Sequence, residues 1–173
     1  MSEYNDIDIR EHLPYLTSIV KEMKAKTILE LGVYQGHSTR AFLKAAEEIG
    51  AIVISIDWND SYPVSYSPNW IFIKANDGTL PIRGNFDILF IDTSHNYIET
   101  LFELEKYSPM VKNPGVILLH DTMSSYNRPL NGVFGAIKEF LRRHPNKWAF
   151  DNLENCNGLG ILKRTKEKDH VKI

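Results

Sequence analysis

The chain has 173 residues, of which 43% are hydrophobic and 24% charged, as is typical of one globular domain with a single core. Its formal net charge is −2, so no overall field favours nucleic acid or an anionic membrane. One cysteine, no long apolar run and no signal-peptide pattern favour a cytoplasmic protein without an internal disulfide. We therefore expect one domain over residues 1–173, with neither a nucleic-acid nor a membrane partner.

Predicted strands and helices alternate along the chain. Apolar residues at helical spacing predict an N-terminal helix over 9–24, within a leading segment 1–26, lying over the mouth of the site or against the sheet. Short apolar runs typical of buried parallel strands follow at 27–31, 51–56, 70–74, 86–91 and 116–119, the last entered by a turn at Pro114 and Gly115.

The remaining segments complete a sandwich. Helices are predicted over 38–49, with Ser38 as N-cap, and over 133–141, stopping before Pro145. A further helix after residue 97 is expected to bury Ile98, Leu101, Phe102 and Leu104. Residues 147–152 and 158–163 predict an antiparallel hairpin, and 164–173 a frayed tail. The fold class is thus α/β: a Rossmann-like, doubly wound, mostly parallel seven-stranded sheet with a closing antiparallel hairpin, in three layers.

A glycine turn follows the first strand, with Gly32 and Gly36 ahead of a helix start. Such a turn lets a ligand approach the backbone at a helix N-terminus, although an ordinary strand-to-helix turn is the alternative. Glu30 lies two residues before Gly32; it would repel a diphosphate but could accept hydrogen bonds from a cationic amino group. The turn also lacks the third glycine of a dinucleotide fingerprint.

Asp57 ends the second strand, 21 positions after Gly36 (57 − 36). An acid there can accept hydrogen bonds from ribose hydroxyls, or it is a solvated strand-end aspartate. Trp58 follows and packs either on an adenine face or as a surface anchor. Beyond it, residues 59–69 form a loop with two tyrosines that could act as a lid or substrate wall.

Asp92, His120 and Asp121 follow the fourth and fifth strands, which are expected to be neighbours. Two carboxylates and an imidazole could hold a hard divalent cation such as Mg²⁺. Alternatively, Asp121 caps the next loop and His120 is a satisfied strand-end histidine. His95, three residues after Asp92, could accept a proton near neutrality, or cap the helix that follows.

The segment 30–38, Glu-Leu-Gly-Val-Tyr-Gln-Gly-His-Ser, resembles the first motif of class I S-adenosylmethionine-dependent methyltransferases. Together with 90–97 and 114–122, it resembles small-molecule O-methyltransferases that include macrolide sugar O-methyltransferases and cephalosporin-hydroxylase-type proteins. The resemblance implies the following cofactor-binding residues: Glu30, Gly32, Tyr34, Gly36 and Ser38 for the methionine part, Asp57 and Trp58 for the nucleoside, Asn76 and Asp77 for the adenine unless they form only an Asx turn, and Asp92.

The same resemblance implies Mg²⁺ on Asp92 and Asp121, with His120 at the third ligand position and His95 as the base. Position 120 departs from the sugar methyltransferases, which carry an acid there. The implied reaction is direct methyl transfer from S-adenosylmethionine to a hydroxyl of a sugar or other small metabolite, with His95 and Asp92 catalytic.

Other functional classes stay open beside this interpretation. A non-catalytic cofactor-binding partner module would need no proton acceptor, and a nicotinamide-dependent oxidoreductase would share the sheet and Asp57. A hydrolase is disfavoured because no G-x-S-x-G motif occurs. The short connections 59–69 and 75–85 leave part of one sheet face thinly covered, a gap that a second copy of the chain could fill.

Overall fold

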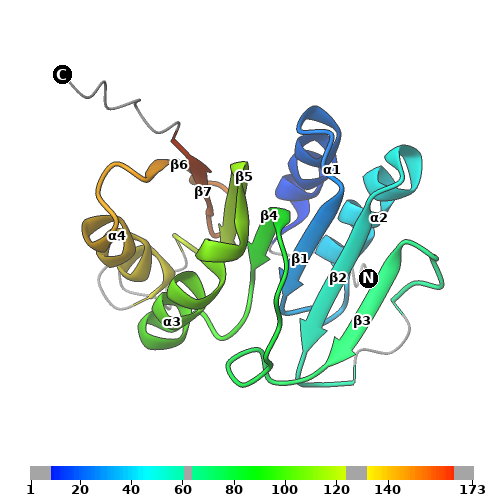
Figure 1. The fold of residues 1–173 in the computed structure, drawn as a ribbon, viewed down its shortest axis with the longest axis horizontal. Coiled ribbons are helices and arrows are strands. Elements are labelled where there is room, and N and C mark those ends of the chain that lie inside the picture. The colour runs from blue at the N-terminus through cyan, green and yellow to red at the C-terminus, as the bar shows by residue number, and fades with distance from the viewer. Residues whose placement is uncertain (1–8, 61–63, 124–131, 166–173) are drawn as a thin grey trace, which may run out of the picture.

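The computed structural model describes residues 9–60, 64–123 and 132–165. Their strands are β1 (Thr27–Leu31), β2 (Ile52–Asp57), β3 (Trp70–Lys74), β4 (Phe86–Ile91), β5 (Val111–His120), β6 (Trp148–Leu153) and β7 (Leu159–Arg164). They form one seven-stranded sheet in the order β3-β2-β1-β4-β5-β7-β6 (Figure 1). The first five strands are parallel, and β7 is antiparallel to both neighbours. The predicted sheet, including the inserted hairpin strand, is confirmed.

Within the described ranges, four helices cover the two faces of this sheet. A 3₁₀ turn (Arg10–His12) leads into α1 (Leu13–Glu22), followed by α2 (His37–Ile49), α3 (Tyr97–Tyr107) with a 3₁₀ turn (Ser108–Met110), and α4 (Val133–Arg143). Pro14 lies in the first turn of α1, where its missing N–H costs no hydrogen bond. Helices α1 and α2 lie on one face and α3 and α4 on the other (Figure 1).

The core consists of two apolar layers, one on each side of the sheet. In β1, Ile28 points into the layer under α1 and α2, whereas Leu29 and Leu31 point into the layer under α3 and α4. This alternation, with both faces buried, explains why the parallel strands read as continuous apolar runs. Helix α1 packs against the sheet, the second of its two predicted positions.

Three local predictions are wrong in detail. The N-cap of α2 is Gly36, and Ser38 lies within the helix with its hydroxyl bonded to Glu30. Strand β5 begins at Val111, because residues 112–115, with the predicted turn, bulge between the pairs Phe86–Val111 and Ile88–Val116. Ile98 and Phe102 are 76% and 49% exposed instead of buried.

The sheet edge at β3 is thinly covered, as expected from the short connections on either side of it. No residue of β3 is buried, and the Ile71 side chain is 47% exposed. No helix within the described ranges is long and apolar enough to cross a membrane. Strand order reverses between β1 and β4, so the chain leaves these strands in opposite directions and opens a crevice at their carboxyl ends.

Candidate active site

The turn after β1 passes directly beside the end of β4. Gly32 has φ +87°, and a Cβ atom there would lie 2.0 Å from the backbone oxygen of Asp92. The Gly32 N–H donates to the Ile56 carbonyl at 2.9 Å, and the Asp92 N–H donates to the Leu31 carbonyl at 2.9 Å. Only glycine fits this conformation and this approach.

Glu30 lies under that turn and is fully buried. Its carboxylate accepts hydrogen bonds from three hydroxyls: Ser38 at 2.6 Å, Thr39 at 2.7 Å and Ser55 at 2.5 Å. Burial raises the pKa of Glu30 to about 7, although the three hydrogen bonds act in the opposite direction. The cluster joins β1, α2 and β2, and it fixes the helix start relative to the turn.

Asp57, at the end of β2, holds the same turn from the other side. Its Oδ2 accepts from the backbone N–H groups of Val33 at 2.8 Å and Tyr34 at 3.1 Å, and its Oδ1 accepts from that of Asn59 at 2.8 Å. A carboxylate offers about four acceptor positions, so Oδ1 keeps one for a ligand.

A cavity of about 1420 Å³ opens along the carboxyl ends of the strands. It is lined by the β1 turn, the end of β2, the turn after β3, the loop after β4 and one side of α3. The turn after β3 is braced from α3, because the Lys106 ammonium donates to the carbonyls of Asp77, Gly78 and Leu80, and the Tyr107 hydroxyl donates to the Asp77 carbonyl.

Four ionisable side chains meet where β4 and β5 end. His95 bridges two carboxylates, with its Nε2 2.9 Å from Asp92 Oδ1 and its Nδ1 3.1 Å from Asp121 Oδ2. Burial alone would lower the pKa of His95, but the hydrogen bond to Asp92 and the charges of both carboxylates outweigh it and raise the pKa. Both ring nitrogens of His95 thus face carboxylate oxygens, an arrangement that favours the protonated imidazole.

His120 is the most deeply buried member of this cluster. Its Nε2 lies 3.0 Å from the Cys156 carbonyl, and its Nδ1 lies 3.3 Å from Asp121 Oδ2 and 3.6 Å from Asp92 Oδ1. Burial opposes the charged form, yet Asp121 and Asp92 raise the pKa of His120 to about 10. The same contacts lower the pKa of Asp92 to about 2, against the effect of its burial.

The sequence profile of a family described as a methyltransferase domain matches residues 29–122, more than half of the chain. The chain belongs to this family. The matched segment contains every element that lines the cavity, from β1 to α3. The predicted methyltransferase family is thereby confirmed.

Solved structures share the fold of this methyltransferase at low sequence identity. The methyltransferase PaMTH1 from Podospora anserina, bound to SAH, is 17% identical with a TM-score of 0.75, over 95% of this chain and 83% of that one. An O-methyltransferase from Bacillus cereus in complex with SAH is 15% identical with a TM-score of 0.66, over 89% and 81%. MycE, from mycinamycin biosynthesis, in complex with Mg and SAH, is 14% identical with a TM-score of 0.71, over 94% and 51%. A comparison with curated proteins found no match.

Most of the predicted cofactor-binding residues of the methyltransferase line the cavity. They are Gly32, Tyr34, Asp57, Trp58, Asn76, Asp77 and Asp92, with His95 beside them. Glu30, Gly36 and Ser38 do not line it. Glu30 and Ser38 bond to each other beneath the turn, so Glu30 supports the start of α2, and its contact with an amino group of the cofactor stays a prediction.

The predicted catalytic end is assembled differently from expectation. Asp92, His95 and Asp121 bring one ligand atom each within 4.8 Å of one another, which is the spacing of a cation site. His120, the predicted third ligand, contributes no atom to this set. The capping alternative for His95 is wrong, since the Asn96 side chain caps α3 by accepting from the Glu99 N–H at 2.9 Å.

Helix α3 supplies three cavity-lining residues that the sequence reasoning missed: Glu99, Phe102 and Glu103. Glu99 and Glu103 are one helical turn apart, directly after the loop of Asp92. This i, i+4 spacing places both acids on one face of α3, and it could have been recognised in the sequence. The sequence predicts Phe102 as a core residue, because an apolar residue on a helix resembles a core residue whichever way its side chain points.

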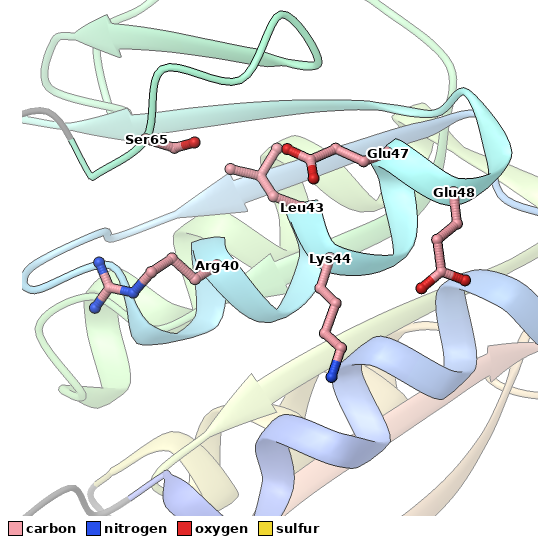
Figure 2. A pocket seen from close by; sticks show the side chains of 6 residues that line it. All are labelled: Arg40, Leu43, Lys44, Glu47, Glu48 and Ser65. Atoms are coloured by element: carbon pink, nitrogen blue, oxygen red, sulfur yellow. The ribbon is translucent and has the colours of Figure 1, made fainter.

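A second, shallower hollow of about 540 Å³ lies over the outer side of α2. Figure 2 shows Arg40, Lys44, Glu47 and Glu48 projecting from this helix, with Ser65 across from Leu43. The two basic and two acidic side chains give this hollow no net electrostatic potential of either sign, so it favours neither anionic nor cationic ligands.

Proposed function

We propose that the protein transfers a methyl group from S-adenosylmethionine to a hydroxyl of a small metabolite, such as a sugar, in the cytoplasm. The observation that carries this proposal is the single cavity onto which the glycine turn, Asp57, the 76–78 turn and the Asp92–His95 loop all open. Two structures with this fold, the methyltransferase PaMTH1 and the Bacillus cereus O-methyltransferase, contain bound SAH. The lone Cys156 has no disulfide partner, which fits a reducing compartment.

The residues of the cavity fit the parts of this cofactor. At Gly32 any Cβ would strike Asp92, so bare backbone faces the place proposed for the methionine end. Asp57 keeps one acceptor position for a ribose hydroxyl, and the exposed Trp58 lines the same cavity. When bound, S-adenosylmethionine supplies an electrophilic methyl group on a sulfonium.

The chain itself has to orient the acceptor and take up its proton. His95 lines the cavity and is the group best placed for this, but both of its ring nitrogens face carboxylates. It becomes a base only after losing its proton and releasing one of these two contacts. We assign Asp92 and Asp121 the task of holding the imidazole until an acceptor replaces one of the contacts.

A divalent cation fits the same two carboxylates. Asp92 and Asp121 offer hard oxygen ligands, and Mg²⁺ is commonly bound through only one or two carboxylates and several waters. Such an ion would supply positive charge to acidify an acceptor hydroxyl. His95 can be a ligand or a proton acceptor but not both at once, so the two roles are competing hypotheses.

Calorimetric titration with SAH, S-adenosylmethionine and NAD tests the cofactor. We expect SAH and S-adenosylmethionine to bind and NAD not to, because the turn after β1 lacks the third glycine of a dinucleotide fingerprint. Binding of NAD alone would replace the proposal with an oxidoreductase. Binding of S-adenosylmethionine without turnover on any hydroxylated acceptor would favour a non-catalytic module.

Metal dependence is tested on the active protein by exhaustive chelation followed by titration with Mg²⁺ and Mn²⁺. A cation held by Asp92 and Asp121 predicts loss of turnover on chelation and its return with either ion. Full turnover after chelation, unchanged by added ions, would leave His95 alone to handle the proton.

A further inference from the structure

The sheet ends at β3, and no described strand pairs with the outer edge of this strand (Figure 1). Among the helices and strands of the described ranges, only β2 makes extensive contact with β3. No residue of β3 is buried, and the Ile71 side chain is 47% exposed. An open apolar strand edge offers backbone N–H and C=O groups to any other strand, so proteins usually protect such an edge or pair it.

The direction of the backbone groups in β3 follows from its hydrogen bonds to β2. The Asn69 carbonyl accepts from the Val53 N–H at 2.9 Å, and the Ala75 N–H donates to the Asp57 carbonyl at 2.9 Å. Because this direction alternates along a strand, the odd-numbered residues of β3 bond to β2. Residues 70, 72 and 74 therefore present their N–H and C=O groups to the outer edge.

The charge that usually protects such an edge is neutralised in β3. A lysine on an edge strand discourages pairing with another strand. Here the Lys74 ammonium donates to Asp60 Oδ2 at 2.6 Å, so the ion pair brings no net charge to the edge. The strand contains no proline, and its other side chains are Trp70, Ile71, Phe72 and Ile73. Strand β3 thus lacks the features that keep edge strands apart.

The side chains of β3 are divided between the two faces of the sheet. Ile71 and Ile73 lie on the face of α3 and α4, because their register partners in β2 belong to that apolar layer. Trp70 and Phe72 lie on the opposite face, where their ring centroids are 5.7 Å apart. Each face of this edge strand is therefore apolar, apart from the paired Lys74.

We propose that two copies of the chain pair through β3, antiparallel about a two-fold axis at Phe72, and so join their sheets into one. This register pairs all five residues of the strand. The Phe72 N–H and C=O groups bond to those of the partner's Phe72, and each Lys74 N–H donates to the partner's Trp70 carbonyl. The Trp70 N–H stays with the Ser67 carbonyl, to which it donates at 3.1 Å.

The side chains of β3 fit a second copy of the same strand. On one face, Ile71 lies opposite the partner's Ile73, and the two such pairs form a continuous apolar row. On the other face, the two Phe72 rings meet, and the Lys74 ammonium lies beside the partner's Trp70 ring, a favourable cation–aromatic contact. No like charges oppose each other, whereas an axis at Lys74 would set two lysines face to face. This self-complementarity favours a second copy over a strand of another protein.

The arrangement leaves both cavities open. The two strands of the pair run in opposite directions, so the carboxyl ends of the two sheets, where the cavities open, point away from each other. The interface is therefore independent of the proposed function, and SAH should bind the monomer and the dimer equally. An edge of five residues is a small interface, for which we expect a dissociation constant of roughly 1 to 100 µM.

Sedimentation equilibrium of the full chain, over about 1 to 200 µM, measures the association, and we expect the parent to change from monomer to dimer in this range. Ile71→Lys places a charge opposite the partner's Ile73 and should raise the dissociation constant by at least about tenfold. Phe72→Pro removes an outward N–H without breaking a bond to β2 and should have the same effect. Ile98→Lys is the matched control: this side chain is 76% exposed on α3, and association should be unchanged.

Disulfide cross-linking tests the register, in a Cys156→Ser background that removes the only native thiol. In a hydrogen-bonded antiparallel pair the Cα atoms lie about 5.5 Å apart, which is within reach of a disulfide. Phe72→Cys, on the axis, should therefore form a covalent dimer under mild oxidation. Lys74→Cys is the control on the same edge: its counterpart lies four residues further along the partner strand, about 13 Å away, so it should not cross-link.

Loss of the dimer in both β3 variants, with cross-linking of Phe72→Cys alone, supports the proposal. A parent that stays monomeric over the whole range overturns it and would leave the edge to a partner of another kind. A dimer that survives Ile71→Lys, or equal cross-linking of Phe72→Cys and Lys74→Cys, overturns it as well, because the interface then lies elsewhere or has no fixed register. If Phe72→Pro fails to fold, Ile71→Lys and the cross-linking decide. Since none of these measurements depends on SAH, a failure of the proposed function is seen separately.

Discussion

Two polar clusters flank the turn after β1, and each satisfies its carboxyl groups in a different way. We call the cluster around Glu30 the closed cluster and the cluster of Asp92, His95, His120 and Asp121 the open cluster. Glu30 is a fully buried carboxyl group surrounded by three hydroxyls, with both of its oxygens occupied. Asp92 and Asp121 are anions balanced by the imidazoles of His95 and His120, and this cluster opens onto the cavity at His95. The first cluster is satisfied by the protein alone, whereas we expect the second to exchange one of its contacts when a ligand binds.

The difference indicates how to tell residues that stabilise the fold of this methyltransferase from residues that bind its ligands or take part in the reaction. A group satisfied by the protein alone should show its importance in the free energy of unfolding. A group whose contacts can be taken over by a ligand should show it in binding or turnover. Asp57 stands between these extremes, because three backbone N–H groups occupy it and one acceptor position stays free.

The sharpest test of the open cluster is His95→Ala. We expect turnover to fall by about 10²- to 10⁴-fold, the usual contribution of a positioned proton acceptor, with SAH affinity nearly unchanged. Single-turnover methyl transfer measures the first quantity and calorimetry the second. Asn96→Ala is the matched control on the same loop: it removes the cap of α3, costs about 1 kcal/mol of stability and should leave turnover intact. Equal turnover in the parent and His95→Ala would remove His95 from the chemistry.

The closed cluster is tested by Glu30→Ala, which strands three buried hydroxyls. We expect a loss of about 3 kcal/mol in the free energy of unfolding, seen as a fall in Tm of about 6–12 °C. Glu30→Gln keeps the shape and most of the hydrogen bonds, so it should lose less. A variant of Glu30 that unfolds like the parent but no longer binds SAH would show that the comparison is wrong and that Glu30 contacts the ligand.

The same residue predicts a pH dependence of stability. The pKa of Glu30 is raised in the folded state to about 7 from its ordinary value of 4.5, so the folded protein holds the proton more tightly than the unfolded chain. This contribution is fully present below pH 4.5 and is lost as the pH rises to about 7, a change of up to about 3 kcal/mol. Denaturant unfolding of the parent minus Glu30→Gln, measured across that range, isolates it.

Much of this arrangement could be predicted from the sequence, for identifiable physical reasons. Strands buried on both faces appear as apolar runs, so β3 and β4 were placed with their observed bounds. Their topology then brought Asp57, Asn76, Asp92 and His95 to one edge. The direction of side chains could not be predicted: Ser38 turned from a cap into a partner of Glu30, and Phe102 faces the cavity. These outcomes depend on contacts between residues far apart in sequence.

The intermediate case, Asp57→Ala, should affect binding and stability together. We expect SAH affinity to weaken by about 1–3 kcal/mol, because a ribose hydroxyl loses its acceptor, and the glycine turn to loosen as Val33 and Tyr34 lose theirs. Asp57→Asn keeps an acceptor on one side and should lose less of both. A drop in stability with unchanged SAH affinity would make Asp57 a support of the turn alone.

Trp58→Ala should have the smallest effect. It tests a residue that lines the cavity but gains little from contacts within the protein. The indole is 72% exposed and lines the cavity, so the protein itself gains little from it. If it stacks on the adenine, its loss should weaken SAH binding by about 0.5–1.5 kcal/mol and change the free energy of unfolding by less than about 0.5 kcal/mol. Tyr66→Ala is the control, because this side chain is 90% exposed but lies outside the residues that line the cavity, and it should change neither quantity. Equal SAH affinity in the parent and in both variants would mean that Trp58 is a surface aromatic only. Weaker binding in Trp58→Ala alone would mean that an exposed ring beside Asp57 is held ready for a ligand.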